Sequence, residues 1–94
     1  MSAVYACMQN EQYKDSVAVA YQKLERKLSR RPDLIKELRA SQASWERFVS
    51  DSCGFLSKFD QGEMGWADAN YSCHSEFYSA RVKALNSWIK KAGG

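Results

Sequence analysis

Three stretches of the chain repeat apolar and small residues at spacings of three and four, which is the period of one face of an α-helix. They cover about residues 4–28, 33–59 and 66–91. The apolar face of the first stretch holds Ala6, Tyr13, Val17, Ala20, Tyr21, Leu24 and Leu28. Because each stretch keeps its period over several turns, the pattern predicts three long helices and no strand.

The second stretch has the strictest repeat. Its positions alternate at spacings of four and three, as in the seam of a helical bundle: Leu34, Leu38, Ser41, Trp45, Phe48, Ser52, Phe55 and Phe59. A glycine inside a helix costs about 1 kcal/mol relative to alanine. The repeat nevertheless continues past Gly54, so we expect the helix to continue there, with the glycine permitting a close approach beside Cys53. We expect Trp45 to lie at the centre of the core.

The breaks between the stretches are short. Pro32 suits the first turn of a helix, and two glycines within residues 60–65 mark a loop. The third stretch has a stripe of Trp66, Asn70, Cys73, Phe77, Ala80, Ala84, Leu85 and Trp88. Short connections make successive helices antiparallel. At 94 residues the chain is therefore predicted to be one all-α domain, a three-helix antiparallel bundle with up-down-up topology.

Three cysteines are present, and this topology places all of them at one end of the bundle. A disulfide between Cys53 and Cys73 would clamp the second helix to the third and stabilise the fold by about 3 kcal/mol in the chain-entropy model. Cys7 would then be free or paired outside the domain. The alternative is three buried free thiols in a cytosolic protein. Zinc ligands usually come in close pairs such as C-x-x-C, which the chain lacks, so no metal is expected.

The sequence offers little for catalysis or for a cofactor. His74, the only histidine, adjoins Cys73, and neighbouring residues on a helix do not face each other. No glycine-rich phosphate loop and no apolar stretch of about 20 residues, as a membrane span requires, is present. The net charge is +3, and the basic residues of 23–31 fit a solvated helix end better than a nucleic-acid site. We expect no enzyme, no cofactor, no nucleic-acid partner and no membrane span.

Two motifs point to a family. Leu38, Gln42, Trp45, Phe48 and Cys53 read L-x3-Q-x2-W-x2-F-x4-C, and Cys73, Arg81 and Leu85 read C-x7-R-x3-L. This pattern resembles the LprI-like family, small secreted helical domains named for a bacterial lysozyme inhibitor, over about residues 13–86. Val49 and Ser50 stand where the family often has Arg-Asp, so the chain resembles a divergent member.

The resemblance implies a periplasmic or secreted protein whose signal peptide is not part of the sequence. It implies binding to a protein partner, as an inhibitor or immunity protein against a peptidoglycan-cleaving enzyme. A net charge of +3 offers no attraction to a strongly basic lysozyme. The charge therefore favours a more acidic hydrolase as the target. Two alternatives stay open: an envelope interaction module without an enzyme target, and a cytosolic adaptor that uses residues 23–31.

The connection between the second and third helices is the predicted partner-binding site, because binding residues tend to lie on loops held by a rigid scaffold. The candidate residues are Asp60, Gln61, Glu63, Met64 and Trp66. The tryptophan could instead be a hydrophobic staple at the start of its helix.

Overall fold

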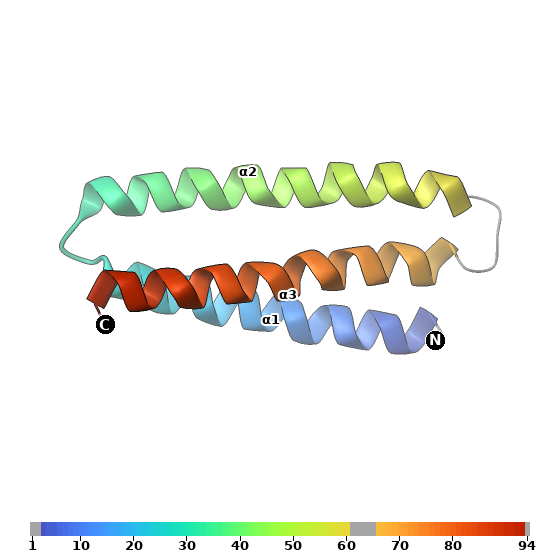
Figure 1. Ribbon diagram of the computed structural model, residues 1–94, viewed down its shortest axis with the longest axis horizontal. Helices are drawn as coiled ribbons and strands as arrows, with labels where there is room; N and C mark the ends of the chain where they lie inside the picture. Colours follow the sequence, from blue (N-terminus) through green and yellow to red (C-terminus); the bar gives the residue numbers. More distant parts are fainter. Residues whose placement is uncertain (1–2, 61–65, 94) are drawn as a thin grey trace.

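The computed structural model describes the backbone of residues 3–60 and 66–93 and the side chains of residues 12–59 and 72–93. Its elements are α1 (Ala3–Lys27), α2 (Pro32–Ser57), the short 3₁₀ helix η1 (Lys58–Asp60) and α3 (Trp66–Gly93). Helices α1 and α3 run in one direction and α2 runs in the other (Figure 1). The predicted all-α, up-down-up arrangement is therefore confirmed.

Local chemistry sets the limits of α2. Pro32 occupies its first turn, where the missing N–H costs no hydrogen bond. The Arg31 guanidinium donates to both carboxylate oxygens of Asp33 at 3.1 and 2.9 Å, and the Asp33 carboxylate also suits the positive end of the helix dipole. The helix continues through Gly54 as expected. An added Cβ at Gly54 would meet nothing within 4 Å, so the expected close approach at this glycine is wrong.

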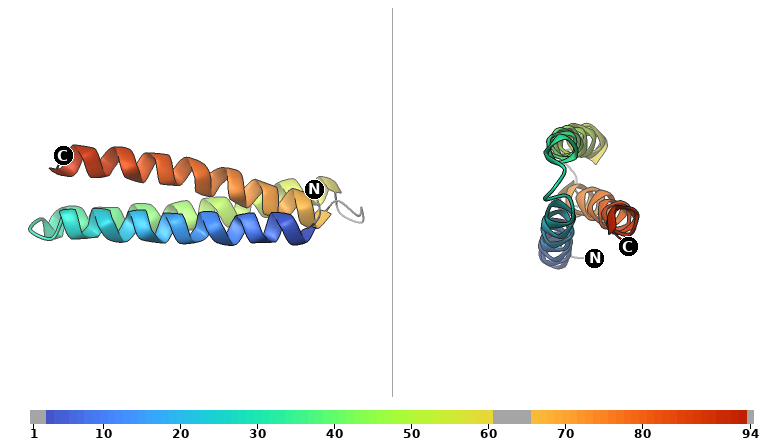
Figure 2. Two further views of the ribbon diagram at one scale, coloured as in Figure 1. Left: turned by 90° about the horizontal axis from the view of Figure 1, so that it is seen from below. Right: turned by 90° about the vertical axis from the view of Figure 1, so that its left-hand side faces the viewer.

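The molecule is elongated, with Cα extents of 50 × 21 × 14 Å. Helix α1 packs closely along α3, whereas α2 contacts α3 more sparsely (Figure 2). The accessible surface is 6702 Å², compared with about 5,500 Å² expected for a compact monomer of this mass. Helix α2 is thus held at a few places and leaves apolar surface uncovered.

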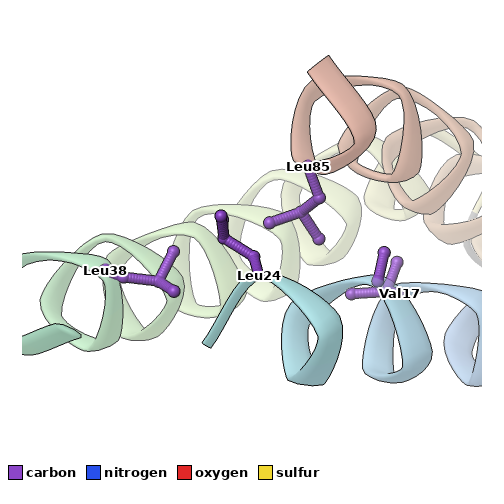
Figure 3. Close-up of a cluster of buried hydrophobic side chains, with 5 residues drawn as sticks. Val17, Leu24, Leu38 and Leu85 are labelled. Carbon is purple, nitrogen blue, oxygen red and sulfur yellow. The ribbon is translucent and has the colours of Figure 1, made fainter. Parts of the chain in front are cut away.

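The core lies where the three helices converge. Its buried residues are Val17, Ala20 and Leu24 of α1, Leu38 of α2 and Leu85 of α3 (Figure 3). Trp45 is half-buried and packs against this cluster, while Leu85 is completely buried. The apolar face predicted for the first helix is confirmed over the described residues, but the centre of the core is Leu85 and not Trp45.

The register predicted for α2 is wrong in its second half. The buried residues there are Val49, Cys53 and Ser57, whereas the expected core residues Phe48, Phe55 and Phe59 are 56%, 61% and 75% exposed. At 100° per residue, these phenylalanines lie roughly 120–160° around the helix from Cys53. A seven-residue repeat drifts by about 20° per heptad on a straight helix. Since the disulfide turns the cysteine toward α3, the drifting seam faces solvent at this end.

The stripe predicted for α3 needs a similar correction. Ala80 is exposed and Trp88 is 36% exposed, although both were expected in the core. Among the described side chains of α3, residues 72–93, the buried ones are Ser75, Arg81 and Leu85. Phe77 is half-buried and makes an edge-to-face contact with Phe48, with ring centroids 5.4 Å apart. An aromatic pair therefore covers the gap between α2 and α3 without becoming core.

Candidate functional site at the disulfide end

A disulfide joins the last turns of α2 to the first half of α3. Cys53 and Cys73 are bonded, with their Cα atoms 5.7 Å apart. Cys53 is fully buried, so the bridge lies between the helices. The bridge predicted from the sequence is confirmed, and three free thiols are excluded. The side chain of Cys7 lies outside the described residues.

The predicted binding loop begins and ends within a few residues of this bridge. Asp60 closes η1 and Trp66 opens α3, but their side chains are outside the described part of the chain. Gln61, Glu63 and Met64 lie outside it entirely. The role of these five residues therefore stays a prediction.

Sequence reasoning missed an exposed row of aromatic side chains, here called the aromatic stripe and formed by Phe48, Phe55 and Phe59. The rings of Phe55 and Phe59 make an edge-to-face contact with centroids 5.5 Å apart, and Leu56 beside them is 47% exposed. Exposed aromatic side chains that cluster on a monomer commonly mark a protein-binding surface. A helical wheel of the sequence places these phenylalanines on the side of the helix opposite Cys53, and this was the signal that could have predicted their exposure.

Charge is divided between the two ends of the molecule. Residues 45–60 and 66–80, which form η1 and the half of α2 and α3 nearest the 61–65 connection (Figure 1), contain five acidic and two basic residues. The opposite half of these helices, with the end of α1, is formed by residues 20–39 and 81–94, which contain eleven basic and three acidic residues. The net charge of +3 therefore hides an acidic end and a basic end.

Arg81 ties the middle of α3 to α2. Its Nε and Nη2 atoms donate to Gln42 Oε1 at 3.1 and 2.9 Å, and Nη2 also donates to Ser41 Oγ at 3.3 Å. The guanidinium carbon lies 5.1 Å from the Trp45 ring centroid and 5.0 Å from that of Trp88. We call Arg81, Gln42, Trp45 and Trp88 the arginine clasp. It joins two helices that otherwise make few contacts.

Burial lowers the pKa of Arg81, because desolvation disfavours the charged form, and the negative charge of Glu46 opposes this shift. The guanidinium nevertheless remains charged, because the ordinary pKa of arginine lies far above neutral pH. Gln42, Trp45 and Arg81 are also residues of the two sequence motifs. Their contacts show that these motif positions link α2 to α3.

The described residues also bear on metal binding, membrane insertion and the single histidine. Among the side chains that the structure describes, no group of three or more histidine, cysteine or acidic residues could hold a metal ion. No described helix is long and apolar enough to cross a membrane. His74 packs its ring against Tyr78, with centroids 5.9 Å apart. The residues that stand out at the disulfide end are the exposed aromatic side chains, which are of the kind that commonly contacts proteins.

Comparison with known proteins agrees with the motifs. Searches of curated proteins and of solved structures gave no match. The family model described as "Lysozyme inhibitor LprI" matches residues 2–85. Because this match spans most of the 94 residues, the chain belongs to the LprI lysozyme inhibitor family.

Proposed function

We propose that this protein is an exported inhibitor of a basic, lysozyme-like peptidoglycan hydrolase and binds it with the disulfide end. Family membership supports an inhibitory role. The Cys53–Cys73 bridge supports an oxidising compartment, because disulfides rarely persist in the cytosol. The bridge also counts against the cytosolic adaptor considered from the sequence.

The observation that carries the choice of binding surface is that the acidic half of the molecule also holds the aromatic stripe. Electrostatic steering depends on the potential of the contacting surface more than on total charge. An acidic end can attract the strongly basic surface of a lysozyme even though the whole chain has a net charge of +3. This charge division reverses the expectation of an acidic target.

The same end is also preorganised for binding. The disulfide fixes the separation of α2 and α3 there, and the aromatic stripe lies on helical backbone, with Phe48 and Phe55 in α2 and Phe59 in η1. A rigid surface loses less conformational entropy on association than a flexible one. Phe55 and Phe59 would enter the partner's surface as apolar anchors, while nearby carboxylates set the approach. Anchors of this kind commonly supply most of the binding energy.

Inhibition of a basic lysozyme acting on suspended bacterial cell walls tests the proposal. The double variant Phe55→Ser, Phe59→Ser should raise the inhibition constant at least tenfold. Its melting temperature should stay close to wild type, because these side chains are 61% and 75% exposed. The matched control is Val19→Ser, which removes a 63% exposed apolar side chain from α1 and should leave inhibition unchanged.

Two results would overturn this assignment. One is undiminished inhibition by the folded double variant. The other is that sedimentation shows a dimer for wild type and a monomer for the double variant, while inhibition does not change. That outcome would make the aromatic stripe an interface between two copies of the chain.

The predicted loop needs its own variant. Changing Asp60 and Glu63 to serine and Met64 to alanine should weaken inhibition at least tenfold with little change in melting temperature, because these residues are proposed to contact the partner and not the core. If that stable variant inhibits as well as wild type, the loop is not part of the interface. If the Phe55→Ser, Phe59→Ser variant also inhibits as well as wild type, the site is sought on the basic end around Arg30 and Arg31.

A further inference from the structure

A second surface lies at the opposite end of the molecule, where α1 and α3 end and α2 begins (Figure 1). An open groove of about 480 Å³ occurs there. Most of its lining is apolar and comes from Leu24, Leu28, Leu34, Leu38 and Trp88. All three helices contribute to it, so the groove depends on the folded bundle.

The groove opens directly onto the core. Its most deeply buried lining residues are Leu24 and Leu38, which are 3% and 7% exposed and converge with Leu85 in the core (Figure 3). Leu34 and Trp88 also line it and are 37% and 36% exposed. A recessed apolar surface of this kind fits a hydrocarbon chain. A flat bilayer surface would not reach the recessed leucines.

Basic residues lie at the same end of the molecule as this groove. Lys91 is part of the lining, and the last turns of α1 and α3 contribute Arg26, Lys27 and Lys90 as well. A Cβ added at Gly93 would lie 3.4 Å from Cδ of Lys27, so this lysine lies beside the end of α3. The two helix C-termini therefore bring four cations to one end of the molecule.

The acidic side chains of this end are largely neutralised. Glu25 pairs with Arg39 at 3.1 Å, and Asp33 pairs with Arg31 at 2.9 Å. Glu37 is the one acidic residue among the described residues of the groove lining. Within the part of the chain that the structure describes, the four cations of the last turns have no carboxylate within ion-pair distance. The groove lining itself holds one cation, Lys91, and one carboxylate, Glu37. The excess of positive charge belongs to the end of the molecule around the groove, where residues 20–39 and 81–94 contain eleven basic and three acidic residues.

From this combination we infer that the groove binds a single-chain anionic amphiphile as a monomer. The hydrocarbon chain lies over Leu24 and Leu38, and the anionic head group lies against Lys91 and Lys27. A free anion would leave the apolar surface uncovered, and an uncharged chain would gain nothing from the lysines. The site is at the far end from the aromatic stripe, so it is independent of the proposed inhibition.

Calorimetric titration with dodecyl phosphate, kept below its critical micelle concentration, tests the inference. Dodecyl phosphate should bind at least tenfold more tightly than dodecylphosphocholine, which has the same chain and no net charge. It should also bind at least tenfold more tightly than octyl phosphate, because affinity grows with each buried methylene. Inorganic phosphate at millimolar concentration should give no binding heat.

Variants locate the site. Leu34→Asp should weaken dodecyl phosphate binding at least tenfold, and an acid near the start of α2 is compatible with the helix dipole. Lys91→Gln should weaken it about threefold. The controls Val19→Asp and Lys36→Gln make the same changes at exposed positions outside the groove lining and should bind as wild type.

Three outcomes would overturn the inference: equal binding of the phosphate and phosphocholine amphiphiles, unchanged binding by a folded Leu34→Asp variant, and binding to phosphatidylglycerol vesicles without binding of the monomer. The last result would identify a membrane surface as the occupant. Phe55→Ser should leave amphiphile binding unchanged, and a loss in that variant would place the ligand on the aromatic stripe instead.

Discussion

Removing the guanidinium of Arg81 should loosen α2 from α3, and a double-mutant cycle with Gln42 measures how much the pair contributes. Arg81 is 9% exposed, and its two bonds to Gln42 share one acceptor oxygen. Hydrogen bonds to a charged group contribute about 1.5–3 kcal/mol. We expect a coupling free energy near the lower limit, about 1.5 kcal/mol, because Gln42 is only half-buried and water can replace part of the interaction.

The complete effect of Arg81→Met should be larger than the coupling. Loss of two cation–π contacts, at 5.1 Å from Trp45 and 5.0 Å from Trp88, adds about 0.5–1 kcal/mol each. Methionine also avoids the desolvation of a buried charge, which offsets part of the loss. The free energy of unfolding should therefore fall by about 2–3 kcal/mol.

Urea unfolding of the oxidised protein, followed by circular dichroism, gives these values for wild type, Arg81→Met, Gln42→Ala and the double variant. Lys83→Met is the matched control, because Lys83 is exposed on the same helix, and it should change stability by less than about 0.5 kcal/mol. A coupling free energy below about 0.5 kcal/mol would show that the arginine clasp does not hold the helices together.

Three further predictions concern stability. Replacing Cys53 and Cys73 with serine should lower the free energy of unfolding by about 3 kcal/mol; a loss under about 1 kcal/mol in urea would contradict a stabilising bridge. Leu85→Ala should cost about 3–5 kcal/mol and Phe55→Ala less than about 1 kcal/mol, and equal costs in the same assay would restore the rejected register. The hydrogen bond from Arg31 is the main reason why the pKa of the Asp33 carboxyl lies below its ordinary value of 3.8. The pair's stabilisation is therefore complete above pH 3.8 and disappears as the pH falls through the folded-state pKa, so wild type and Asp33→Asn should converge in acid melts; a constant difference would exclude the pair.

The sequence predicts α1 well and the second half of α2 poorly, for a physical reason. Helix α1 has one apolar face, and Val17 and Leu24 on it are buried. In α2 the seven-residue repeat predicts a core seam, but a straight helix carries such a repeat gradually around its axis. Cys53 was the better guide to the inward face, because a covalent bond to α3 fixes its direction.

The arginine clasp and the apolar groove could not be predicted from the sequence, because each is formed by residues of different helices. The motif residues Gln42 and Arg81 are 39 positions apart, and their shared hydrogen bonds appear only once α2 and α3 are aligned. Likewise, the apolar groove forms only when Leu34 and Trp88 come together with Leu24 and Leu28, which lie in another part of the chain. The division of charge between the two ends also depends on which helix ends meet.

The most direct test of the central claim is a map of the interface by NMR. Isotope-labelled protein is titrated with a basic lysozyme, and backbone amide shifts are followed along the chain. Binding through the disulfide end predicts the largest changes at residues 48–60 and 66–77, with little change at residues 23–39 and 84–93. The largest changes at residues 23–39 and 84–93, or no change at a concentration that inhibits the enzyme, would contradict the account.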